Sequence, residues 1–247
     1  MHYIKVMSFI YFFALNVSLF GQYSILDTIQ NMRNNSLKVK SLIIPATLAT
    51  YGFISLGNEN VRQVDFKVSE FLGNKSKNTI DDYLIYLPLA VDIGLTTGGY
   101  KSKHNYKEKA ALYFMSTTLN AVLVYPVKAI TSRARPDESD FRSFPSGHTS
   151  NAFVGAEYFW QEYKSRSKWL AVSGYVVAAT TGYFRLQNNK HWLSDVLTGA
   201  GIGMLSTKVC FWLFPMVKKI VKPNQYFTVF PSVGQNYMSA NLICYIK

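Results

Sequence analysis

The sequence predicts an all-α protein: a bundle of about six helices that is embedded in a membrane and ends in a short β-like tail. Three observations predict this fold. Apolar segments of helical length recur along the chain, basic stretches separate them, and the small-residue run Gly199–Gly203 would let two helices approach closely. Of the 247 residues, 49% are hydrophobic and 16% are charged, which is enough apolar material for one domain with a sizeable core.

Residues 1–21 have the pattern of a secretory signal peptide. A short positive region ends at Lys5, an apolar run follows from Val6 to Phe20, and Gly21 marks the expected cleavage point. Leu19 occupies a position that prefers a smaller residue, so a retained N-terminal anchor is the alternative. Both interpretations direct the chain to an export pathway.

Residues 22–80 are expected to hold a polar lead-in, a short apolar helix at 41–56 and an amphipathic helix at 59–78. Pro45 and Gly52 interrupt the apolar segment, which is shorter than the about 20 residues that a bilayer span needs. Charged and apolar residues recur at helical spacing in the second segment, so that helix is expected to lie on a surface.

Residues 81–222 form the predicted main domain, and residues 223–247 form a tail. The apolar runs of this domain, each of which predicts a helix, are 83–95, 110–127, 149–163, 169–184 and 191–217. In the tail, alternating residues with turn formers at Pro231 and Gly234 indicate a small hairpin.

Three polar segments lie between the long apolar runs. The first, Lys128–Pro136, supplies fixed cations, and the second, Pro145–His148, supplies a glycine-opened helix start with free backbone N–H groups. The third, Arg185–Asp195, adds another cation and a histidine that is followed four residues later by a carboxylate. Because a phosphate ester needs these groups, the segments predict a phosphoryl-transfer site.

These segments resemble the three motifs of the type 2 phosphatidic acid phosphatase (PAP2) superfamily, K-x6-R-P, P-S-G-H and S-R-x5-H-x3-D. The matching residues are Lys128, Arg135 and Pro136 in the first, Pro145, Ser146, Gly147 and His148 in the second, and Arg185, His191 and Asp195 in the third. One residue departs from the pattern, since Phe184 stands where the family usually has serine. The departure removes one expected polar contact near the phosphate.

The resemblance implies a role for each matched residue. His191 is the nucleophile that forms a phosphohistidine, His148 is the general acid that protonates the leaving alcohol oxygen, and Asp195 orients His191. The residues expected to bind the phosphate are Lys128, Arg135, Ser146, Gly147 and Arg185. No metal or cofactor is implied.

Residue spacing adds two geometric expectations. Lys128 and Arg135 are seven residues apart, so a helix that continued past Lys128 would place both on one side. His191 and Asp195 are four apart, so on one helix the carboxylate would accept the imidazole N–H and fix its tautomer.

Net charge and residue composition limit the kinds of partner that the protein is expected to bind. The net charge of +12 suits a phosphorylated substrate or an anionic membrane surface. No basic stretch with interleaved exposed aromatics stands out, which argues against nucleic acid. The two cysteines form no C-x-x-C, and the four histidines lack zinc-site spacing, so a metal-dependent enzyme is disfavoured. His104, in the basic loop 101–109, is expected to be a solvated loop residue.

The basic stretches 101–109, 161–168 and 218–222 lie at helix ends opposite to the three polar segments. Because positive loops stay in the cytoplasm, the polar segments are expected to face the periplasm of a bacterial cell envelope. A cleaved signal followed by two spans would place residues 101–109 outside, which contradicts that orientation. Three arrangements stay open: a retained N-terminal segment, an early apolar segment that does not span, or a soluble periplasmic bundle.

The expected activity is a metal-independent phosphatase acting on phosphate monoesters or diphosphates of lipids: phosphatidate, phosphatidylglycerol phosphate, undecaprenyl diphosphate or lipid A. Apolar helices beside the site would hold acyl or prenyl chains. The alternatives are a soluble periplasmic acid phosphatase for small esters, a vanadium-dependent haloperoxidase with similar motifs, and a non-enzymatic membrane protein with a degenerate site.

Overall fold

The computed structural model describes residues 39–73, 79–220, 225–234 and 237–246. The predicted signal peptide or anchor, and the lead-in up to residue 38, lie outside the described residues. The chain divides into two compact units, one of which is Leu37–Trp212 and the other of which contains the described residues after Trp212. Each unit is described by itself.

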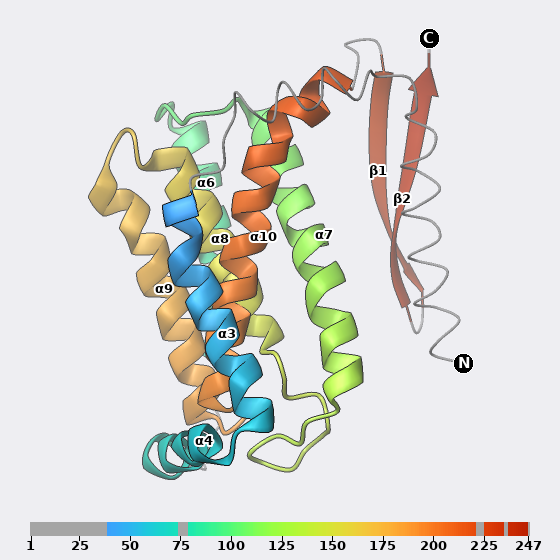
Figure 1. Ribbon diagram of the computed structural model, residues 1–247. Coiled ribbons are helices and arrows are strands. Elements are labelled where there is room, and N and C mark those ends of the chain that lie inside the picture. The colour runs from blue at the N-terminus through green and yellow to red at the C-terminus, as the bar shows by residue number, and fades with distance from the viewer. Residues whose placement is uncertain (1–38, 74–78, 221–224, 235–236, 247) are drawn as a thin grey trace. The chain divides into compact units, whose positions relative to one another are not determined.

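The unit Leu37–Trp212 is a helical bundle, which confirms the predicted fold class (Figure 1). A 3-10 turn, η1, precedes eight α-helices in the described residues, the last of which continues past this unit. Their bounds are η1 Val39–Leu42, α3 Ile43–Gly57, α4 Glu59–Leu72, α5 Ile80–Leu84, α6 Leu87–Thr97, α7 Tyr106–Thr131, α8 Gly147–Tyr163, α9 Lys168–Gln187 and α10 Leu193–Ile220.

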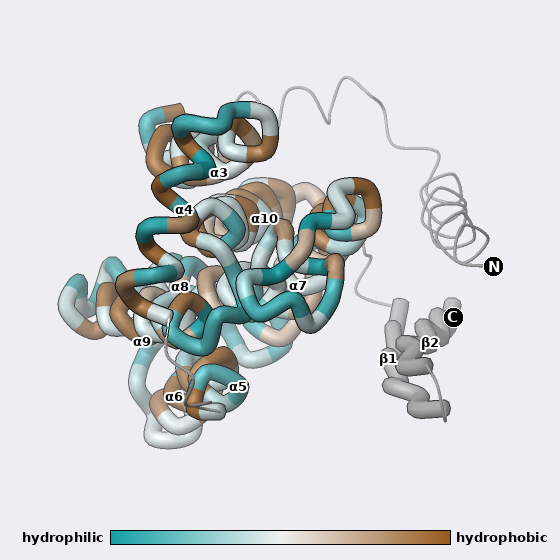
Figure 2. The backbone as a smooth tube through the Cα atoms, turned by 90° about the horizontal axis from the view of Figure 1, so that it is seen from below, coloured by the Kyte–Doolittle hydropathy of each residue, from teal (hydrophilic) through white to brown (hydrophobic). Residues whose placement is uncertain are grey.

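This number is larger than the expected six or so, partly because one predicted helix is split. The predicted helix 83–95 is broken into α5 and α6, because Pro88 stands in the first turn of α6 and has no N–H to continue the preceding helix. The predicted amphipathic helix is α4, which ends at Leu72 and lies across the end of the bundle, as Figures 1 and 2 show. Its apolar residues Val64, Phe66 and Phe71 are exposed, as expected for a surface helix.

Local capping signals fix where the long helices begin. Asn105 and Glu108 form a reciprocal capping box at the start of α7. The Ser146 side chain caps α8 and the Ser167 side chain caps α9, each by accepting a backbone N–H three residues later. As a result, α8 begins at the second polar segment, and α9 delivers Arg185 at its far end.

Helix α10 packs closely against α8 through the small-residue run that the sequence singled out. A Cβ on Gly203 would lie 2.2 Å from the Ser150 carbonyl oxygen, and one on Gly199 would lie 2.5 Å from that of Ser146. Neither distance is possible for a real side chain, so glycine is required for this approach. The close contact holds the start of α10 beside the start of α8.

Three helical stretches are long and apolar enough to cross a membrane: Val39–Gly57, Tyr106–Thr131 and Leu193–Lys218. The stretch Val39–Gly57 corrects the expectation that the early apolar segment is too short for a span. The turn η1 extends this segment toward the N-terminus, to 19 residues. Only 22% of the first two windows is buried in the protein. Apolar side chains such as Ile44, Phe53 and Phe114 therefore face outward.

At the end of the bundle opposite to the polar segments, buried carboxylates pair with bases. Lys109 Nζ lies 2.6 Å from Asp92, and Lys208 Nζ lies 2.7 Å from Glu157. The expectation for His104 was wrong: its Nδ1 lies 2.6 Å from Glu162 Oε1, and its side chain is only 17% exposed. The loop folds back onto α8, which places this histidine against a buried carboxylate.

The second unit contains an antiparallel hairpin, which confirms the β-like tail. Strands β1 (Gln225–Gly234) and β2 (Tyr237–Ile246) pair from Gln225 opposite Ile246 to Gly234 opposite Tyr237.

Candidate active site

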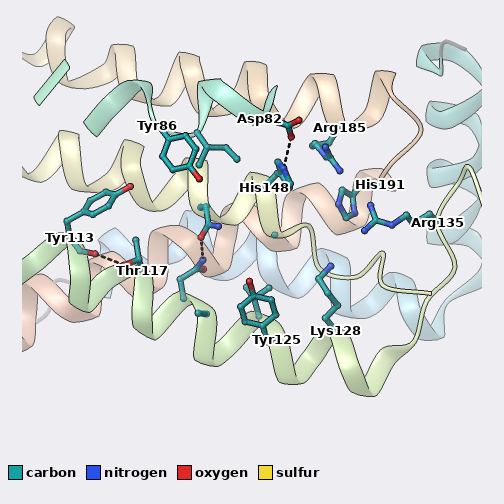
Figure 3. A pocket seen from close by; sticks show the side chains of 16 residues that line it. Asp82, Tyr86, Tyr113, Thr117, Tyr125, Lys128, Arg135, His148, Arg185 and His191 are labelled. Carbon is teal, nitrogen blue, oxygen red and sulfur yellow. Dashed lines mark hydrogen bonds and ion pairs between the residues drawn. The ribbon is translucent and has the colours of Figure 1, made fainter. Parts of the chain in front are cut away.

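The three polar segments meet at one end of the bundle, around a cavity of about 730 Å³. Helices α5, α7, α8 and α9 and the segments beside them supply its walls, and Figure 3 shows the side chains that point into it. Six of the eight predicted site residues line the cavity: Lys128, Arg135, Gly147, His148, Arg185 and His191. The other two, Ser146 and Asp195, are fully buried beneath the lining.

Lys128 and Arg135 both reach the cavity, but not from one helix as the spacing predicted. Helix α7 ends at Thr131, and Ser132 adopts a left-handed conformation with φ of 42° that stops the helix. Arg135 therefore lies in the following loop. Its Nε donates to Asp140 Oδ1 at 2.6 Å, and its Nη1 donates to the Lys190 carbonyl at 3.1 Å.

Lys128 is held by backbone oxygen atoms of the loop before α8. Its Nζ donates to the carbonyl oxygens of Arg142 at 2.6 Å and Pro145 at 2.7 Å. No carboxylate among the described residues forms an ion pair with it, so its charge is available to an anion in the cavity.

The second predicted arrangement, His191 and Asp195 on one helix, was also wrong. Helix α10 begins at Leu193, and His191 precedes it. His191 Nδ1 lies 3.6 Å from Asp195 Oδ2, and this buried nitrogen has no hydrogen-bond partner. The distance between these two atoms is short enough for a charge interaction but too long for the expected hydrogen bond.

The carboxylate of Asp195 instead accepts hydrogen bonds from three other groups. Arg133 Nη1 and the Trp192 backbone N–H each lie 2.9 Å from its oxygens, and the Ser143 hydroxyl makes a short contact. The Trp192 contact is that of a carboxylate near a helix N-terminus, which the helix dipole favours.

His191 is neutral at physiological pH. Burial lowers the pKa of its imidazole to about 4, and the nearby Arg185 and Lys128 act in the same direction, while Asp195 opposes them. A neutral imidazole keeps a free lone pair, which a nucleophile requires.

His148 lies in the first turn of α8, next to Gly147. The two backbone N–H groups at these positions have no partner within the helix and belong to the positive end of its dipole. The His148 Nε2 lies 2.8 Å from Asp82 Oδ1. Burial and Arg185 lower the pKa of His148 below its ordinary value, and the Asp82 contact partly offsets them. Ser146 acts from below as the cap of the helix.

Arg185 is buried at the end of α9 and forms an ion pair with a residue that the sequence did not flag. Its Nη1 lies 2.6 Å from Asp81 Oδ2, while its Nε is buried without a partner. This orphaned donor at the cavity wall is suited to an anion. Phe184, which replaces the family serine, does not line the cavity.

Sequence reasoning missed four charged residues that support the site: Asp65, Asp81, Asp82 and Arg133. Asp65 is fully buried and accepts from Arg133 Nη2 at 2.8 Å and from the Ser194 N–H at 2.8 Å. Arg133 lies inside the first polar segment and Asp81 and Asp82 begin a helix, but their partners are far away in sequence. No local spacing could have identified those pairs.

The arrangement places three cations and two histidines around one cavity, which is suited to an anion. Three positive side chains, a helix start and a neutral imidazole converge on one cavity that is otherwise walled by apolar and aromatic groups, including Ile85, Tyr86 and Val124. Within the described residues, no group of three or more His, Cys, Asp or Glu residues is placed to hold a metal ion. Fold and site together define a helical-bundle protein with a cationic cavity at one end, a cavity suited to an anion such as phosphate.

Comparison with known proteins gives the particular family. Residues 109–219 match the model of the PAP2 superfamily, so this part of the chain, with all three polar segments, belongs to that superfamily. The chain is 34% identical over 185 residues to the lipid A 1-phosphatase of Porphyromonas gingivalis. The match covers 74% of this chain and spans 40% of the length of that relative.

A solved structure has the same fold. The crystal structure of a transmembrane PAP2-type phosphatidylglycerolphosphate phosphatase from Bacillus subtilis matches with a TM-score of 0.51 at 22% sequence identity. The match covers 73% of this chain and 98% of that one.

Proposed function

We propose that this protein is a membrane-bound phosphatase of the PAP2 type that hydrolyses a lipid phosphate, with a phosphorylated glycolipid of the lipid A kind as the first candidate. The single observation that carries the proposal is the convergence of neutral His191, the acid candidate His148 and three cations on one cavity with apolar walls. Similarity to the lipid A 1-phosphatase supports the choice of lipid.

In the first step, Lys128, Arg135 and Arg185 bind the oxygens of the phosphate, with the N–H groups at the start of α8. The lone pair of His191 Nε2 then attacks phosphorus, because Nδ1 faces Asp195 and carries the proton. The bond to the leaving alcohol oxygen breaks, and His148 gives that oxygen its proton.

The second step releases the phosphate. His148, now neutral, accepts a proton from a water molecule, whose oxygen attacks the phosphorus of the phosphohistidine. The P–N bond breaks and its electron pair returns to His191. Inorganic phosphate leaves, and both histidines regain their starting protonation states. Three cations stabilise the charge on the equatorial oxygens throughout.

The apolar wall of the cavity supports a lipid over a small ester. Tyr86 and Tyr125 are 63% and 67% exposed, although both line the cavity together with Val124. These side chains would contact the acyl chains of a lipid while its phosphate reaches the cations. An orientation with the site on the periplasmic side of the inner membrane fits the basic loop 101–109 at the opposite end.

The test is phosphate release from detergent-solubilised protein in EDTA. A lipid A 1-phosphate, phosphatidate, phosphatidylglycerol phosphate, undecaprenyl diphosphate and p-nitrophenyl phosphate are compared, with His191→Ala as control. We expect metal-independent release that favours the glycolipid and falls at least about 1,000-fold in the variant. Preference for the small ester would indicate a soluble-type acid phosphatase. Release of no phosphate, with bromide oxidation in vanadate and peroxide, would indicate a haloperoxidase.

A further inference from the structure

Helix α5 begins with two adjacent carboxylates that contact two different site residues. Asp81 is buried and pairs with Arg185, and Asp82 lies 2.8 Å from the Nε2 of His148. Both contacts join α5 to residues more than 60 positions later in the chain. The start of α5 is therefore part of the site, although it lies outside the three family segments.

The surroundings of His148 pose a problem for its role as an acid. The cations Lys128, Arg135 and Arg185 line the same cavity, and burial also disfavours a charged imidazole. The other histidine in the lining, His191, is neutral and adds no negative charge. Left alone, His148 would reach neutral pH without the proton that the leaving oxygen needs.

Asp82 supplies the opposing charge. Among the residues of the described chain that line the cavity, it is the only carboxylate, and its oxygen is within hydrogen-bond distance of the imidazole. Asp81, its neighbour, is turned toward Arg185 and Asn188 instead. A carboxylate this close favours the protonated imidazole.

We propose that Asp82 is a positioning residue that raises the protonated fraction of His148 and orients it for proton transfer to the leaving alcohol. This inference rests on the proposed phosphatase function and deepens it. Asp82 does not touch phosphorus in this scheme. Its effect is confined to substrates whose leaving group needs a proton.

The first experiment compares Asp82→Asn and Asp82→Glu with the wild-type full-length chain in detergent. An alkyl phosphate lipid has a poor leaving group, whereas p-nitrophenolate leaves without a proton. We expect Asp82→Asn to lose at least about 10-fold in kcat on the lipid and less than about 3-fold on p-nitrophenyl phosphate. The alkaline limb of its kcat/KM profile on the lipid moves down by about one pH unit, and Asp82→Glu restores it.

Asp137→Asn is the matched control. It removes the same charge from the neighbouring loop, where Asp137 pairs with Lys190 at 2.5 Å and does not line the cavity. We expect its alkaline limb to stay in place. Equal losses on both substrates in Asp82→Asn, with an unmoved limb, would show a purely structural contact and overturn the inference.

A second measurement does not require turnover. The pKa of His148, followed by NMR of ¹⁵N-labelled histidine, falls in Asp82→Asn by about one unit if the inference holds. An unchanged pKa overturns the inference even in an active enzyme. A lowered pKa in a protein that hydrolyses neither ester overturns the proposed function while keeping the Asp82 contact.

Discussion

At the scale of single residues, the site depends on where two histidines hold their protons. His191 is fully enclosed and its Nδ1 has no hydrogen-bond donor or acceptor in contact, whereas His148 is half-exposed and touches a carboxylate. These different surroundings assign different tasks to two chemically identical side chains. In the proposed mechanism, His191 provides a lone pair and His148 provides a proton.

The pH dependence of kcat/KM follows from these two groups. His191 must be neutral, so activity is expected to fall below about pH 4, the pKa to which burial lowers it. His148 must be protonated, and its pKa lies below the ordinary 6.5, so activity is expected to fall as the pH rises through that lower value. A bell-shaped profile with an acidic optimum results. A profile that still rises above pH 8 would contradict these assignments.

Sequence patterns predicted the site residues of the three polar segments but not the charged residues that hold them in place. The residues of the three segments gather because each stands at a helix end, and helix ends of one bundle meet. The partners of those residues follow no such rule. Asp65 reaches Arg133 from another helix, and nothing in the spacing of either residue encodes that pair.

At the scale of elements, the contact between α8 and α10 depends on the absence of side chains. Gly203→Ala would place a Cβ 2.2 Å from the Ser150 carbonyl oxygen, so the two helices must separate. We expect a loss of about 1–3 kcal/mol in stability, measured as a lower midpoint of thermal unfolding in detergent. Gly94→Ala in α6 is the control, since its Cβ meets nothing within 4 Å. Equal midpoints for both variants would contradict close packing at Gly203.

Helix α4 is joined to the site by a buried ion pair. Asp65 is 0% exposed. In Asp65→Ala, the guanidinium of Arg133 would lose one of its two carboxylate partners, and the Ser194 backbone N–H would lose its acceptor. We expect a cost of about 3–5 kcal/mol and a marked loss of phosphate release, because Arg133 also holds Asp195. Glu59→Gln breaks the exposed pair with Arg62 in the same helix and is expected to change neither quantity. A mild effect of Asp65→Ala would show that α4 is dispensable to the site.

Element boundaries explain both geometric errors. Lys128 and Arg135 were expected on one helix, but a left-handed Ser132 ends α7 between them. His191 was expected inside α10, but that helix begins two residues later. Propensity and apolar periodicity locate the middle of a helix well, while its last turn is decided by tertiary contacts that a sequence pattern does not contain.

At the scale of the whole molecule, the described helices combine an interior rich in paired polar groups with an apolar exterior. Buried carboxylates such as Glu157 and Glu162 have basic partners, and Ile44, Phe53 and Phe114 face outward. The apolar exterior differs from the polar surface that is usual for water-soluble bundles. It is suited to a lipid environment, where unpaired polar groups are costly.

Membrane association is therefore testable by fractionation. We expect the protein to sediment with membranes, to resist extraction by 1 M salt or alkaline carbonate, and to dissolve in detergent. An alkaline phosphatase or fluorescent-protein fusion to the loop 101–109 would then report on which side that loop lies. Release by salt alone would favour the soluble periplasmic alternative and contradict the apolar exterior as a membrane surface.

The absence of a side chain at Gly199 also bears on which substrates the cavity can accept. A Cβ at this position would lie 2.5 Å from the Ser146 carbonyl oxygen, so any larger residue would push the start of α8, which carries His148, away from α10. In the proposed mechanism the phosphoryl group fits between His148, at this helix start, and His191, just before α10, so a contact between two helix backbones helps to set the space for it. Attempts to enlarge the range of esters accepted under the proposed function should therefore leave Gly199 unchanged and vary the apolar wall of the cavity instead.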